Sequence, residues 1–104
     1  MSRLEQLAKM LQADGNDVFL NYALALEYVK ADRHEEALAQ FAHVTELDPK
    51  YVAAWSQRAE LLVTLGRHAE ARQVYADALK AAESASDKHA AQKIRDALAL
   101  LGDR

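Results

Sequence analysis

The residues of this chain that could do chemistry are few, and their spacing suits neither a metal centre nor an active site. No two of the four histidines lie four residues apart, as two metal ligands on one helix would. They are His34, His43, His68 and His89. The adjacent pair Glu35-Glu36 opens a predicted helix, where carboxylates interact favourably with the helix dipole. The three glycines stand alone and there is no cysteine, which excludes a phosphate-binding loop and a thiolate site. We therefore expect no enzymatic activity, no metal and no cofactor.

The composition favours helices and gives no reason to expect a charged macromolecule as partner. The chain has 104 residues, with 22 Ala and 15 Leu against six Val, one Ile and two Thr. Its net charge of −3 argues against nucleic acid and against a membrane surface. The basic cluster near the end is interrupted by Asp87 and Asp96, and we interpret it as a solvated face. It consists of Lys88, His89, Lys93 and Arg95.

No apolar run reaches the roughly 18 residues that a membrane span needs, and residues 1–11 are too polar for a signal peptide. We expect a soluble, cytoplasmic protein.

Helix-breaking and capping residues divide the chain into six predicted helices. Turn residues gather at 14–17 and 48–50, while Gly66 and Gly102 suit helix C-termini. Between them apolar residues recur three and four positions apart, which is the period of a helix with one buried face. The predicted helices cover about residues 3–13, 18–31, 34–47, 52–65, 68–83 and 87–101.

The sequence repeats itself at a fixed period, and this repeat defines the architecture. Residues 33–37 align with residues 67–71, with four of five positions identical. Further matches at the same offset are Val18 with Val52, Ala25 with Ala59, Val29 with Val63, Phe41 with Tyr75, and Ala42 with Ala76. A fixed period of about 34 residues with two helices in each unit is typical of a helical solenoid.

On these residues the chain resembles the tetratricopeptide repeat family across residues 18–85. The first repeat matches at Leu24, Ala25, Tyr28, Ala37, Phe41 and Pro49; the second matches at Trp55, Ala59, Leu62, Gly66, Ala71, Tyr75 and Ala78. Three residues depart from the family pattern. Asn21 replaces the first aromatic residue, Arg58 stands where Leu is usual, and Glu83 replaces the second Pro, which suggests a longer fifth helix.

The resemblance implies an all-α fold, a right-handed solenoid of helical hairpins. We expect a single domain over residues 1–104. It would consist of an N-terminal half-repeat helix (2–17), repeat 1 (18–51), repeat 2 (52–85) and a C-terminal capping helix (86–104). Terminal helices of this kind cover the faces that the repeats cannot bury alone.

One predicted helix, residues 18–31, carries more apolar surface than a single buried face requires. Leu20, Leu24, Tyr28 and Ala31 form the expected core-facing set. A second apolar stripe consists of Phe19, Tyr22, Leu26 and Val29. A helix that is apolar nearly all round is buried on both sides or binds something.

In the family that the chain resembles, the first helix of each repeat lines a concave groove that takes up peptides. The resemblance therefore implies a non-enzymatic protein–protein interaction module. The stripe would form the apolar end of the groove, Gln57, Glu60 and Val63 a more polar middle, and His89, Gln92 and Asp96 a far wall. Tyr22, Leu26 and Glu60 stand where carboxylate-clamp members of the family have Lys, Arg or Asn, which argues against chaperone C-terminal tails as ligands.

Two other interpretations of the stripe remain open at this point. The N-terminal helix could cover it, or it could join two copies in a homodimer, which would make the chain a self-associating scaffold without a separate ligand. The predicted partner-binding residues are Phe19, Tyr22, Leu26, Val29, Gln57, Glu60, Val63 and Gln92.

Overall fold

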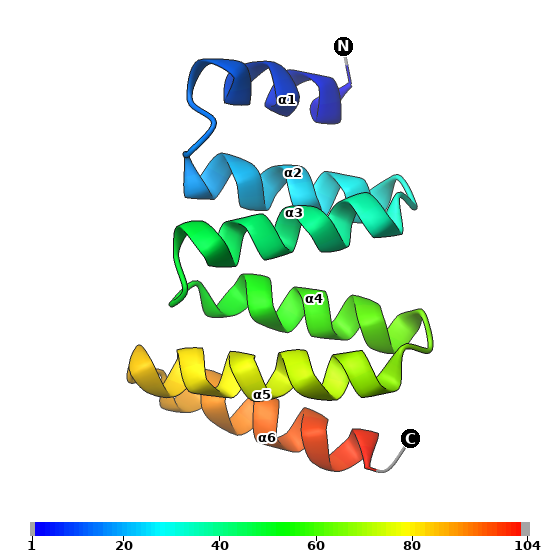
Figure 1. Cartoon of the computed structure of the whole chain (residues 1–104), viewed down its shortest axis with the longest axis vertical. Helices are drawn as coiled ribbons and strands as arrows, with labels where there is room; N and C mark the ends of the chain where they lie inside the picture. The colour runs from blue at the N-terminus through cyan, green and yellow to red at the C-terminus, as the bar shows by residue number, and fades with distance from the viewer. Residues whose placement is uncertain (1, 103–104) are drawn as a thin grey trace. The chain divides into compact units, whose positions relative to one another are not determined.

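The computed structural model describes residues 2–102, and every regular element in that range is an α-helix. The chain divides after Asp48 into two compact units. The first holds α1 (Arg3–Ala13), α2 (Val18–Lys30) and α3 (His34–Leu47); the second holds α4 (Val52–Thr64), α5 (His68–Ser84) and α6 (Lys88–Leu101) (Figure 1). The predicted all-α class is confirmed, and each predicted helix boundary lies within one residue of the observed one. The last two residues of the predicted capping segment, 103–104, lie outside the described residues.

None of the helices within residues 2–102 combines the length and the apolar character that crossing a membrane requires.

In the first unit, α2 packs against both α1 and α3. Ala25 of α2 and Ala37 of α3 are fully buried, so small side chains lie where the two helices approach closely. Phe41 of α3 is also fully buried, and Leu7 of α1 nearly so. The start of α1 has a capping box, in which the Glu5 backbone N–H donates to the Ser2 hydroxyl at 3.1 Å.

The second unit repeats this plan, with α5 packed against both α4 and α6. Ala59 of α4 and Ala71 of α5 are fully buried, one repeat after Ala25 and Ala37. The fifth helix is longer than its counterpart α3, with 17 residues against 14, as the absence of Pro at position 83 predicted. Ile94 and Leu101 of α6 are buried and close the unit.

Three tight turns of one type join α2 to α3, α4 to α5 and α5 to α6. In each turn one residue has a positive φ: Asp32 (59°), Gly66 (77°) and Ser86 (56°). The residue that follows donates its backbone N–H to a carbonyl in the last turn of the preceding helix, at 2.9, 2.9 and 2.8 Å respectively. These are the bonds of a Schellman motif. The predicted place of Gly66 at a helix C-terminus is confirmed, whereas no sequence signal marked the positive φ of Ser86 in the expected turn after residue 83.

Asn21, which departs from the family pattern, has a clear structural role. Its side chain is buried, and its Nδ2 donates to the Gly15 carbonyl at 3.0 Å and to the Asp17 carbonyl at 2.9 Å. Its Oδ1 accepts a hydrogen bond from Gln40. In the second unit, Trp55 Nε1 donates to the Pro49 carbonyl at 3.0 Å. Trp55 and Pro49 lie one repeat after Asn21 and Gly15. The indole of Trp55 and the amide of Asn21 therefore donate to carbonyls at equivalent positions of the two loops.

Candidate functional site

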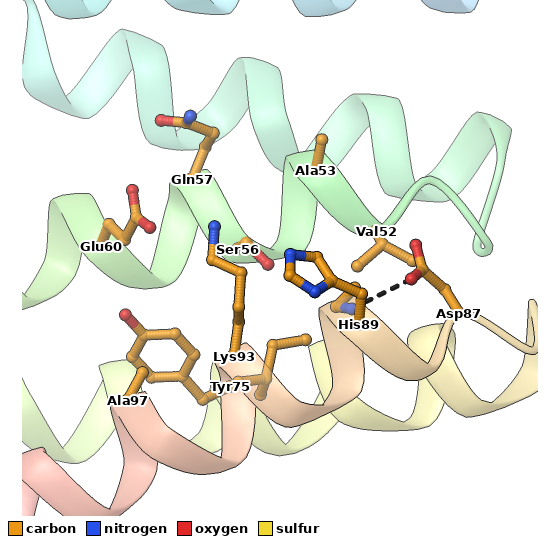
Figure 2. A pocket seen from close by; sticks show the side chains of 12 residues that line it. Val52, Ala53, Ser56, Gln57, Glu60, Tyr75, Asp87, His89, Lys93 and Ala97 are labelled. Atoms are coloured by element: carbon orange, nitrogen blue, oxygen red, sulfur yellow. Dashed lines mark hydrogen bonds between the residues drawn. The ribbon is translucent and has the colours of Figure 1, made fainter.

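The second unit contains a cavity of about 330 Å³ between α4 and α6, which we call the α4–α6 groove (Figure 2). Residues three and four apart on one helix share a face, and this spacing holds on both walls. The lining residues are Val52, Ala53, Ser56, Gln57 and Glu60 from α4, Tyr75 from α5, and Asp87, His89, Ala90, Lys93, Ile94 and Ala97 from α6 and its cap. The groove exists because small side chains occupy central positions on both walls.

Polar side chains in the α4–α6 groove lack partners within the described residues. Ser56, Gln57, Glu60, His89 and Lys93 carry no side-chain hydrogen bond or ion pair there. Some polar side chains elsewhere on the same unit are paired, as Arg95 is with Glu83 at 3.5 Å. A set of unpaired donors and acceptors around apolar side chains is the usual make-up of a binding site.

The Glu60 carboxylate lies near the phenol of Tyr75. Burial raises the pKa of Tyr75 above its usual value of 10.0, and the negative charge of Glu60 raises it further. Figure 2 shows these two side chains toward one end of the groove, His89 and Asp87 toward the other, and Lys93 between them. Asp87 caps α6 by accepting from the Ala90 backbone N–H at 3.0 Å.

The structure distributes the predicted residues of the second unit over three cavities. Gln57 and Glu60 line the α4–α6 groove. Val63 lines a smaller cavity of about 200 Å³ that shares Tyr75 and Ala97 with the groove, so it continues along the same two helices. Gln92 lines neither of these; it donates to Asp96 at 3.0 Å and lies on a separate cavity beside Ala82.

Lys93 is a groove residue that sequence reasoning did not propose. The prediction placed it on a solvated face with His89, and both residues are exposed, but both also line the groove. His89 was expected there as part of the far wall. A usable signal for Lys93 was present, because Ala90, Ile94 and Ala97 follow the helical period on either side of it. Lys93 thus lies at the edge of the buried face of α6, which consists of Ala91, Ile94 and Leu101.

The four predicted residues of the first unit all lie on α2, but they differ in exposure. Phe19 is 67% exposed. Tyr22, Leu26 and Val29 are partly buried, and the Tyr22 ring lies 6.0 Å from the Phe41 ring on α3, at an angle of 54°. The stripe is thus partly covered by the unit's own third helix, and Phe19 is its exposed member.

The remaining candidates for chemistry are engaged or isolated. Glu36 accepts two hydrogen bonds from Arg33, which lower the pKa of the Glu36 carboxyl. Arg67 and Glu70 form the equivalent pair in the second unit. Residues 2–102 bring together no group of three side chains suited to holding a metal ion. His34 and His68 each begin a helix, as predicted for packing residues, and their Nδ1 atoms are buried without a hydrogen-bond partner in the same range.

Known proteins share both the sequence pattern and the fold. A TPR repeat-containing protein of Pseudomonas aeruginosa is 31% identical over 91 residues, which cover 88% of this chain and 87% of the relative. The solution structure of a tetratricopeptide repeat domain protein from Salinibacter ruber has a TM-score of 0.79 and 32% identity, over 85% of this chain and 89% of that one. The TPR2B domain of yeast Sti1, in complex with pHsp70, has a TM-score of 0.84 at 18% identity, over 94% of this chain and 78% of that one.

The family model described as tetratricopeptide repeat matches residues 22–87, which are more than half of the chain and include parts of both units. The repeat period, the paired helices with buried alanines, and the sequence and structural likeness agree with this match. The chain belongs to the tetratricopeptide repeat family.

Proposed function

We propose that this chain is a non-enzymatic protein-interaction module and that the α4–α6 groove binds a peptide segment of a partner protein. The observation that carries the proposal is the set of unpaired polar side chains around the apolar side chains of the groove. The fold gives general support, since the yeast Sti1 domain with this fold is in complex with pHsp70. The partner would be a protein or a peptide.

The dimensions of the groove suit a short segment. From Val52 to Glu60 the α4 wall of the groove extends for about 12 Å at 1.5 Å per helical residue. An extended peptide advances about 3.3 Å per residue, so about four of its residues would contact the wall. Val52, Ile94 and the ring of Tyr75 offer apolar contacts to such a segment, while Gln57 and Ser56 can hydrogen-bond its backbone.

The test is to fill the groove and measure peptide binding. Short random peptides displayed on phage are selected on the wild-type protein, and the enriched sequences are synthesised. Ala53→Trp should weaken their binding about tenfold or more, because Ala53 is exposed and lines the groove. Ala69→Trp is the matched control, since Ala69 is exposed on α5 and does not line the groove. Equal binding to both variants would refute the proposal.

Self-association is a second candidate function, favoured by the exposure of Phe19. Phe19 is 67% exposed on α2, and a second copy of the chain could bury its ring by packing against it. Light scattering over a wide concentration range should then give a mass above 11.6 kDa for the wild type and 11.6 kDa for Phe19→Glu. Phe19 is a cleaner choice than Tyr22, because Tyr22 packs on Phe41. A wild-type mass equal to that of one chain at every concentration would exclude this candidate.

A further inference from the structure

Glu60 differs from the other glutamates of the second unit in having no cation beside it. Glu70 is held by Arg67 at 2.9 Å, and Glu83 pairs with Arg95 at 3.5 Å. The Glu60 carboxylate has no such pair within the described residues, although it lies at the α4–α6 groove. An unpaired carboxylate at a groove is available for a positive charge from outside the chain.

The first unit shows how this chain holds a guanidinium when it has one. The Arg33 guanidinium donates to both oxygens of Glu36, and its Cζ atom lies 4.9 Å from the centre of the Tyr28 ring. A carboxylate thus fixes the cation by hydrogen bonds, while a tyrosine ring adds a cation–π contact. Arg33 is therefore held by one carboxylate and one tyrosine ring.

Glu60 supplies such a carboxylate in the groove without the guanidinium, beside Tyr75, whose side chain is largely buried at 6% exposure. Both line the cavity, and they lie toward the same end of it (Figure 2). From these observations we propose that this end of the groove binds an arginine or lysine side chain of the partner peptide. The inference rests on the proposed function, and it assigns the chemistry of one position in the bound segment.

Lys93 limits where that basic side chain can lie. It projects from the opposite wall, between the Glu60 end and the His89 end, and it has no ion-pair partner within residues 2–102. A second positive charge in the middle of the groove would be repelled by it. The preferred segment therefore has one basic residue at the Glu60 end, followed by neutral or acidic residues toward Lys93.

The experiment compares peptides selected by phage display on three proteins: the wild type, Glu60→Lys and Glu46→Lys. Glu46 is an exposed residue of α3, so its substitution makes the same change in net charge outside the second unit. The wild type and Glu46→Lys should enrich Arg or Lys at one fixed position. Glu60→Lys should lose that preference and enrich Asp or Glu there. Far-UV circular dichroism checks that each variant is folded.

A second measurement uses the best wild-type peptide and a variant that leaves the size of residue 60 almost unchanged. Replacing the peptide's basic residue by Ala should lower its affinity for the wild type about tenfold, and should have little effect on binding to Glu60→Gln. This double-mutant cycle isolates the contact between the two groups.

The outcomes separate the inference from the proposed function. Peptides that lose binding to Ala53→Trp but show the same residue preference on the wild type and on Glu60→Lys would overturn the inference alone. Peptides that bind Ala53→Trp and Ala69→Trp equally would overturn the proposed function and the inference with it.

Discussion

Asn21→Asp is predicted to destabilise the protein strongly, although the two side chains have nearly the same shape. The Nδ2 atom that donates to the Gly15 carbonyl at 3.0 Å and to the Asp17 carbonyl at 2.9 Å would become an oxygen. The Gly15 and Asp17 carbonyls would lose this donor, although Gly15 is exposed and the Asp17 carbonyl still accepts from the Asn21 backbone N–H at 3.1 Å. The main cost is a carboxylate at a buried position beside two carbonyl oxygens, which is about 1–3 kcal/mol for an unsatisfied polar group and more for a charged one. The expected loss in the free energy of unfolding at pH 7 is therefore about 2–4 kcal/mol. With a urea dependence of about 1–3 kcal/mol per molar, the unfolding midpoint should fall by about 1–2 M.

The matched control for this substitution is Asn16→Asp. Asn16 is exposed, lies in the same loop, and uses only its backbone N–H in the bond to Asp14. The same charge added there should cost less than about 0.5 kcal/mol. Both variants and the wild type are unfolded in urea and followed by circular dichroism. If the two variants share one midpoint at pH 7, the Asn21 hydrogen bonds do not stabilise the loop and the reasoning is wrong.

The pH dependence of the Asn21→Asp deficit is a further part of this prediction. The introduced carboxyl group would lie buried beside two carbonyl oxygens, which disfavour its charged form and raise its pKa above the unfolded value of about 3.9. Because the pKa is higher in the folded state than in the unfolded state, the free energy of unfolding falls as the pH rises from the unfolded value to the folded one. The deficit relative to Asn16→Asp should therefore shrink as the pH falls toward about 4 and be smallest below that value, where a protonated carboxyl can donate to one carbonyl.

Two further predictions concern the turns and the groove tyrosine. A Cβ atom at Gly66 would meet no heavy atom within 4 Å, so Gly66→Ala should cost only the strain of its positive φ, about 1 kcal/mol. Asp32→Gly should stabilise the equivalent turn by about 0.5 kcal/mol. Midpoints of urea unfolding that move in the opposite directions would contradict this. The Tyr75 phenol should ionise above pH 10.0 in an ultraviolet absorbance titration, because burial and then the charge of Glu60 raise its pKa. Glu60→Gln should lower that pKa, and stability should fall as the pH rises above 10.0, since the folded state resists the ionisation. Identical titration curves for the wild type and Glu60→Gln would contradict this.

The fold could be predicted from the sequence because its determinants are local and repeated. The repeat period and the apolar spacing define which residues share a helix, and the turn residues mark where each helix ends. Gly66 indicated a left-handed turn for the same reason. Ser86 was missed because serine has no special preference for a positive φ.

The site was predicted less completely, because its geometry depends on how neighbouring helices meet. The apolar stripe on α2 was predicted from the spacing within one helix. That spacing contains no information on the contact between the Tyr22 ring and Phe41 of α3. Lys93 was assigned to a solvated face and is exposed, but the pattern on one helix could not show that it also lines the groove beside α4. The hydrogen bonds of Asn21 join a helix to the preceding loop and to α3, and no pattern in the sequence indicates them.

The pairing of helices within each unit has a consequence for how the chain acquires its structure. In the first unit α2 packs on α1 and α3, and in the second α5 packs on α4 and α6, so each of these contacts joins helices that follow one another along the chain. Three-residue turns close three of these four pairs, so little loop entropy is lost when each pair forms. Proteins dominated by such short-range contacts fold in microseconds to milliseconds. Each hairpin can therefore form as soon as both of its helices are available, without waiting for the rest of the chain.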